Sequence, residues 1–125
     1  MQHLAIVAAG GAIGVSLRHL VNTLSLRLAG PGFPWGTLAV NLFGCLAMGL
    51  FIGLAARRLG VSNELRLFVA TGVLGGFTTF SAFSLDFASL WERGTLVSAF
   101  LYVLASVGGS LMALFAGLWL ARSLG

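Results

Sequence analysis

Apolar and polar positions divide the chain into four long apolar runs separated by three short connections. The connections read GPGFPW, which holds both prolines, then RRLGVSNE and WERG. A transmembrane helix needs about 20 predominantly apolar residues, and each run provides them. The pattern therefore predicts an all-α integral membrane protein with four transmembrane helices per subunit and both termini on one side of the membrane. The expected spans form one membrane domain over residues 1–125 and cover about 4–28, 36–56, 65–91 and 95–121.

Composition agrees with a membrane protein. Apolar residues make up 58% of the chain and charged residues only 8%, whereas a soluble domain carries about 25% charged residues. The net charge of +4 is the balance of seven arginines and three acidic residues, and the arginines lie mostly between the apolar runs. Lipid headgroups are therefore the expected partners of these arginines, and no nucleic acid is expected. A single cysteine, Cys45, excludes an intrachain disulfide.

The arginines of the predicted bundle show only a weak bias toward one side of the membrane. Arg27 and Arg93 fall on the side opposite the termini, and the other side has twice as many. The positive-inside rule sets orientation by the difference in arginine and lysine count between the two sides. Because this difference is small, the orientation of the chain in the membrane is poorly specified. Random insertion and an antiparallel dimer built from both orientations both follow from this. The arginines on the side of the termini are Arg57, Arg58, Arg66 and Arg122.

The third run contains TGVLGGFTTFSAFS, residues 71–84, which concentrates glycines, hydroxyls and phenylalanines without a charge. Adjacent glycines allow the helix to break near Gly75–Thr79. A break leaves backbone N–H and C=O groups without helical partners, and such groups are tolerated in a membrane only when they are buried in protein or line a cavity. Thr78, Thr79 and Ser81 can satisfy some of these groups, and inward-facing carbonyls would suit a hard cation. Phe80 and Phe83 share a face on resumed helix, where their electropositive ring edges could flank a small anion. A kinked, tightly packed helix would carry the same pattern.

Polar residues occur in the other runs as well. Asn41 either bonds a neighbouring helix or lines a pore, and Arg18 either bonds backbone carbonyls or attracts anions in a vestibule. The hydroxyls of Tyr102, Ser106 and Ser110 recur every four residues and line one face, although a serine often bonds its own helix.

Small residues predict where helices pack. They recur every four residues in the second and fourth runs, at Gly49 and Gly53 and at Ala105, Gly109, Ala113 and Gly117.

Taken together, these residues resemble the Fluc/CrcB family of fluoride ion channels over essentially the whole chain. The resemblance rests on GGFTTFSAFS (75–84), its most specific part, and on three further motifs in the order and spacing of that family. These are GGAIGVSLRH (10–19), WGTLAVNLFGC (35–45) and YVLASVGGS (102–110).

The resemblance implies a fluoride-selective passive channel of the cell inner membrane that exports cytoplasmic fluoride and gives fluoride resistance. It implies an antiparallel dual-topology homodimer with two pores. It also implies a structural sodium ion held by the backbone carbonyls of Gly75 and Thr78, and no organic cofactor. Ala82 stands where many members of the family have a hydroxyl, and Leu114 stands where some members extend the polar track with a threonine. The implied fluoride pathway comprises Asn41, Phe80, Phe83, Tyr102, Ser106 and Ser110, with Thr79 and Ser81 beside it and Arg18 near the vestibule.

Three other functions compete with a channel. A small multidrug-resistance transporter needs a carboxylate in its first span, and residues 1–30 contain none. A proton-coupled fluoride antiporter needs a titratable group in its pathway, and Asp86 and Glu92 fall near the end of the third run. A non-transporting membrane subunit would explain the glycines but not a broken span rich in hydroxyls. No catalytic or nucleotide-binding motif is present, so the protein is not expected to be an enzyme.

Overall fold

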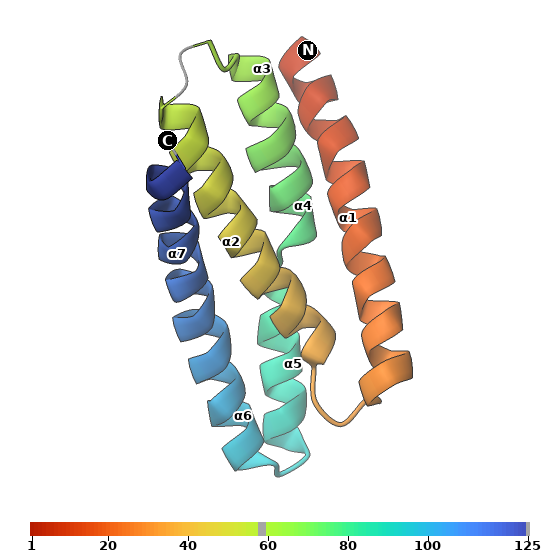
Figure 1. Cartoon of the computed structure of the whole chain (residues 1–125). Coiled ribbons are helices and arrows are strands. Elements are labelled where there is room, and N and C mark those ends of the chain that lie inside the picture. The colour runs from red at the N-terminus through yellow and green to blue at the C-terminus, as the bar shows by residue number, and fades with distance from the viewer. Residues whose placement is uncertain (58–59, 125) are drawn as a thin grey trace.

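The computed structural model describes residues 1–57 and 60–124, and in this part of the chain every regular element is helical. Four helical segments lie side by side, with both termini at one end (Figure 1). Each segment is long and apolar enough to cross a membrane, which confirms the predicted all-α membrane protein. The segments run Gln2–Ala29, Trp35–Arg57, Asn63–Glu92 and Leu96–Leu124. Arg58, which belongs to the arginine count, lies outside the described residues.

The first two segments are single helices, α1 (Gln2–Ala29) and α2 (Trp35–Arg57). The other two each contain a π-helical stretch, which occurs often at functional sites. The third segment comprises α3 (Asn63–Arg66), the π-helix η1 (Leu67–Leu74), α4 (Gly75–Phe77) and α5 (Ser81–Glu92). The fourth comprises α6 (Leu96–Val103), the π-helix η2 (Leu104–Gly108) and α7 (Gly109–Leu124).

The helix ends follow local chemistry. Gly30 after α1 and Gly94 after α5 have φ angles of 76° and 79°, a region that glycine enters without strain. At the start of α3 the hydroxyl of Ser62 accepts a hydrogen bond from the Leu65 N–H at 3.0 Å. Ser62 therefore caps this helix, and Asn63 is its first residue.

Glycines bring α2 and α7 into close contact, as their spacing predicts. A Cβ on Gly53 would lie 2.5 Å from the Ala121 Cβ, and one on Gly117 would lie 2.6 Å from the Leu50 N. The stripe of small residues predicted in the fourth run is shifted by one turn. Its first member, Ala105, is exposed, and Ala121, one turn beyond its last member, is buried in the contact with α2.

A second close contact joins α1 to η1 and α4. It was not predicted, because the predicted stripes of small residues lie in the second and fourth runs. Gly10 and Gly14 are the only buried residues of α1. A Cβ on Gly10 would lie 2.6 Å from the Phe68 carbonyl oxygen, and one on Gly14 would overlap the Val73 carbonyl oxygen. Backbone against backbone is the close packing that small residues allow in membranes.

This contact can be tested with two glycines of one helix. Gly14→Ala is expected to destabilise the protein by about 1–3 kcal/mol, because the added methyl has no room against Val73. Gly11→Ala is the matched control, since a Cβ there meets nothing within 4 Å. Thermal unfolding in detergent measures both variants. Equal melting temperatures for the two would contradict the packing described for Gly14.

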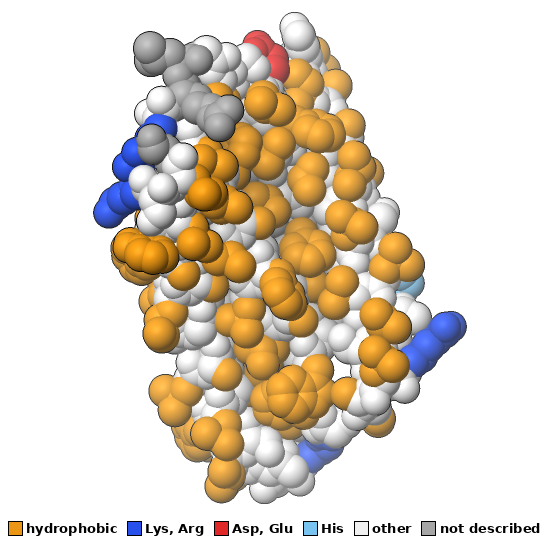
Figure 2. All heavy atoms as spheres, viewed as in Figure 1, with side chains coloured by type: hydrophobic (Ala, Val, Ile, Leu, Met, Phe, Trp, Pro, Cys, Tyr) orange, Lys and Arg blue, Asp and Glu red, His pale blue; other side chains and the backbone are white. Residues whose placement is uncertain are grey.

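The core lies between the second, third and fourth segments, toward the end that carries the first and third connections. Tyr102 and Ala99 have no exposed surface, and they pack with Leu38, Phe83 and Leu90. Phe33 from the first connection packs against this cluster. Hydrophobic side chains otherwise cover the length of the molecule, as Figure 2 shows for one face, which suits contact with lipid tails.

Candidate functional site

The helical third segment is interrupted at the end of α4. Thr78 has an extended backbone with φ −87° and ψ 160°, and α5 begins only at Ser81. The glycine pair itself is helical, and Gly76 lies against α1, where an added Cβ would meet the Gly11 carbonyl oxygen at 2.8 Å. Extended backbone in the middle of a segment needs partners for its polar groups.

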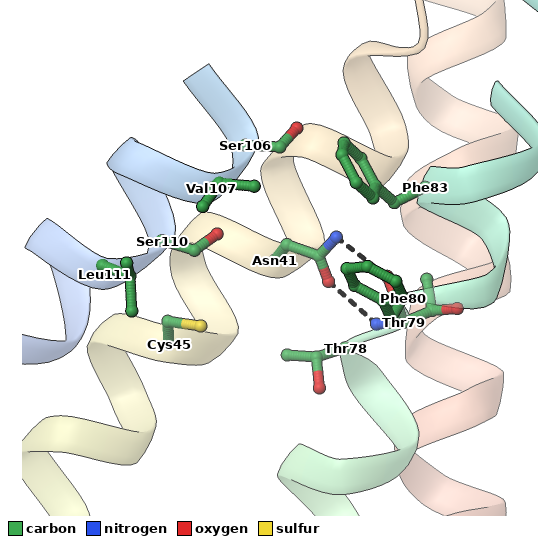
Figure 3. Close-up of a pocket in the computed structure, with 10 residues that line it drawn as sticks. All are labelled: Asn41, Cys45, Thr78, Thr79, Phe80, Phe83, Ser106, Val107, Ser110 and Leu111. Carbon is green, nitrogen blue, oxygen red and sulfur yellow. Dashed lines mark hydrogen bonds between the residues drawn. The ribbon is translucent and has the colours of Figure 1, made fainter. Parts of the chain in front are cut away.

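Asn41 of α2 supplies two of these partners (Figure 3). Its Oδ1 accepts a hydrogen bond from the Thr79 N–H at 2.8 Å, and its Nδ2 donates one to the Thr79 carbonyl oxygen at 3.0 Å. The pairing requires this orientation of the amide and leaves one N–H of Nδ2 available. Asn41 thus bonds a neighbouring helix, one of its two predicted roles, and it also lines a cavity.

Hydroxyl groups satisfy further backbone groups at the interruption. Thr79 Oγ1 accepts a hydrogen bond from the Ala82 N–H at 3.2 Å and lies 3.3 Å from Ser81 Oγ. The Thr78 hydroxyl donates to the Leu74 carbonyl oxygen at 3.0 Å. Thr79 therefore caps the first turn of α5, whose N-terminal end carries a partial positive charge.

The same hydrogen bonds affect the carbonyls of Gly75 and Thr78. In a continuous α-helix these carbonyls would accept from the N–H groups four residues on, which are those of Thr79 and Ala82. Both N–H groups donate to side chains instead, to Asn41 Oδ1 and to Thr79 Oγ1. The two carbonyl oxygens are thereby released from the helical pattern, which makes them suitable ligands for a hard cation.

Phe80 and Phe83 lie beside the interruption with very different surroundings. Their ring centroids are 5.4 Å apart and their planes are inclined by 51°. Phe80 is 74% exposed in the single chain, whereas Phe83 is 8% exposed and packs against Tyr102, with the ring centroids 5.1 Å apart and the planes inclined by 46°. Both rings line the same cavity.

This first cavity has a volume of about 310 Å³ and lies between α2, the interrupted third segment and the fourth segment. Figure 3 shows Ser106 and Ser110 on the fourth segment, across Asn41 from the two phenylalanines. Ser106 is 4% exposed, and its Oγ has no hydrogen-bond partner among the described residues. The polar residues that line the cavity are Asn41, Thr78, Thr79, Ser106 and Ser110, and none of the described lining residues is acidic.

Three residues of the predicted fluoride pathway do not line the first cavity: Tyr102, Ser81 and Arg18. Tyr102 is buried behind Phe83, and its hydroxyl donates to Asp86 Oδ2 at 3.0 Å, a partner that the sequence did not indicate. Arg18 lines another cavity of about 470 Å³, together with His19, Thr79 and Ser81. A guanidinium, an imidazole and hydroxyls around one cavity provide donors for an anion.

Comparison with known proteins identifies the family of the chain. Residues 5–118 match the family model described as CrcB-like protein, Camphor Resistance (CrcB). A protein of Mesorhizobium japonicum named "Fluoride-specific ion channel FluC" is 65% identical over 124 residues, which cover 99% of each chain. Proteins with the same name from Chelativorans sp. and Agrobacterium fabrum are 62% and 60% identical, again over 99% of each chain.

Proposed function

The chain belongs to the CrcB family, and on this premise we propose that it is a passive, fluoride-selective ion channel of the cell inner membrane. It lets cytoplasmic fluoride leave down its electrochemical gradient and so gives fluoride resistance. The observation that carries the proposal is the first cavity, where hydrogen-bond donors meet two phenyl rings and no acidic residue is among the described lining residues. Passive flow requires neither a nucleotide nor catalysis.

The chemistry of the first cavity suits fluoride. A small, strongly hydrated anion must exchange its water shell for donors, as selectivity filters in general require. The remaining N–H of Asn41 and the Ser106 hydroxyl are such donors. The ring edges of Phe80 and Phe83 add weaker positive potential without a fixed charge, so the ion can also leave.

The channel is proposed to be an antiparallel homodimer with two pores. The first cavity is bordered by side chains that are exposed in the single chain, Phe80, Val107 and Leu111, so a second subunit can close it into a passage. The weak arginine bias favours insertion in both orientations. In this dimer the interruption of the third segment lies at the centre of the membrane.

A structural sodium ion is proposed at the interruption. The carbonyls of Gly75 and Thr78 from both subunits would hold it, and their release from the helical pattern supports the assignment. The ion would offset the partial negative charge of these carbonyls beside an anion pathway.

The function is tested by fluoride efflux from liposomes that contain the purified protein, read with a fluoride electrode. We expect fast release of fluoride but not of chloride, with only a potassium ionophore needed to balance charge. Vesicles prepared without sodium are expected to release fluoride more slowly. Release that requires a proton gradient would indicate a proton-coupled transporter instead, and no release at all would favour a non-transporting subunit.

A further inference from the structure

Cys45, the single cysteine of the chain, lines the first cavity. It follows Asn41 by one turn of α2, so the two side chains share a face of that helix. A Cβ on Gly44, the preceding residue, would overlap the Thr78 side chain, so α2 approaches the interruption closely at this point. Figure 3 shows Cys45 on α2 with Thr78 opposite it. The thiol is half-buried and is not part of a disulfide.

A second group indicates that a polar ligand enters the same cavity. Ser106 is 4% exposed, and its hydroxyl has no hydrogen-bond partner among the described residues. A buried hydroxyl costs free energy unless it is bonded, so water or an ion is its expected partner. Because Ser106 and Cys45 line one cavity, small solutes that reach the hydroxyl also come near the thiol.

We propose that Cys45 is a modification site on the ion pathway, where small sulfur electrophiles of the thiosulfonate class form a mixed disulfide and so stop fluoride flow. The effect on flow rests on the proposed channel function, whereas the reaction itself does not. The thiolate is the reactive form of a cysteine, and reactive cysteines lie in partly exposed surroundings that tolerate its negative charge. Cys45 meets both conditions, since it is half-buried and none of the described residues that line its cavity is acidic.

The reaction exchanges one sulfur–sulfur bond for another. The Cys45 sulfur attacks the sulfenyl sulfur of the thiosulfonate, and a disulfide bond forms between them. The bond between the sulfenyl and sulfonyl sulfurs breaks, and the sulfinate leaves with its electron pair. The thiol proton passes to water, and the thiosulfonate itself is the oxidant. A dithiol such as dithiothreitol reduces the mixed disulfide and restores the thiol.

A charged adduct on Cys45 opposes an anion in two ways. Sulfonatoethyl methanethiosulfonate leaves an ethylsulfonate group on the sulfur, which takes up part of a cavity of about 310 Å³. The sulfonate also places a fixed negative charge one turn from Asn41, a proposed donor to fluoride. Like charges repel strongly where the dielectric constant is low, so fluoride would be kept out of the passage.

Fluoride efflux from liposomes measures this effect. The purified protein is treated with sulfonatoethyl methanethiosulfonate before it enters the liposomes. Efflux is expected to fall about tenfold or more and to recover after dithiothreitol. Cys45→Ser is the matched control, because it is close to cysteine in size but has no thiol. Treated and untreated samples of this variant should release fluoride at the same rate, whatever that rate is.

Mass spectrometry of the intact chain is the second measurement, and it does not depend on transport. One adduct is expected on the parent chain and none on Cys45→Ser. A folded parent chain that takes up no adduct would overturn the modification site. Complete modification with unchanged efflux, or an equal loss of efflux in treated Cys45→Ser, would overturn the place of Cys45 on the pathway. An untreated parent protein that releases no fluoride but takes up the adduct contradicts the channel function and supports the modification site.

Discussion

Asn41→Ala is expected to abolish most fluoride efflux and also to destabilise the folded protein. The substitution removes both partners of the Thr79 backbone and leaves its N–H and carbonyl unpaired in a membrane interior. Each buried group that loses its partner costs about 1–3 kcal/mol, so the two together cost about 2–6 kcal/mol. Efflux falls because the same residue provides a donor to the first cavity and holds the interruption in place. Efflux per folded protein and the free energy of unfolding are the two measurements.

Asn22→Ala is the matched control for stability. Asn22 is also half-buried in a membrane segment, but no hydrogen bond joins its side chain to another described residue. It should therefore lose much less free energy of unfolding than Asn41→Ala. If Asn41→Ala unfolds more readily but conducts fluoride at the parent rate, Asn41 serves packing alone and is not part of the pathway.

Asn41 also illustrates how far the sequence determines this site. An asparagine inside an apolar run is conspicuous, because a polar group there needs a partner. Its partner is the backbone of Thr79, 38 residues away, and a backbone group leaves no trace in the pattern of side chains. The residue could therefore be predicted, but its two hydrogen bonds could not.

For the fold as well, the glycines could be predicted to matter, but their partners could not. Four apolar runs are enough to predict four helices, because in a membrane the backbone must satisfy itself. Gly75 and Gly76 drew attention as the cause of a break, yet both are helical, and the extended residue is Thr78. Gly76 instead allows α1 to approach, and so do Gly10 and Gly14 from the other side. Which helix a glycine faces depends on the arrangement of the bundle, which the pattern of one chain does not specify.

Phe80→Ile and Phe83→Ile are each expected to lower fluoride efflux about two- to tenfold. An aromatic edge contributes about 0.5–1.5 kcal/mol beyond the area it buries, and 1.36 kcal/mol of barrier is a factor of ten in rate. Isoleucine keeps an apolar side chain in place but has no ring edge. Phe80, which is 74% exposed in the single chain, should lose efflux with little change in unfolding, whereas Phe83 belongs to the core and should lose stability as well.

Phe115→Ile is the control for these variants, since Phe115 is a phenylalanine of α7 with 66% of its surface exposed and does not line the first cavity. Parent-like efflux in either Phe80→Ile or Phe83→Ile would remove the role proposed for ring edges.

The reason to expect a loss of efflux is that conduction needs weak and repeated binding of the ion. A guanidinium in place of the rings would attract fluoride more strongly but would hold it. In the proposed pathway, two neutral rings 5.4 Å apart, next to donors from Asn41 and Ser106, would attract the ion and still release it.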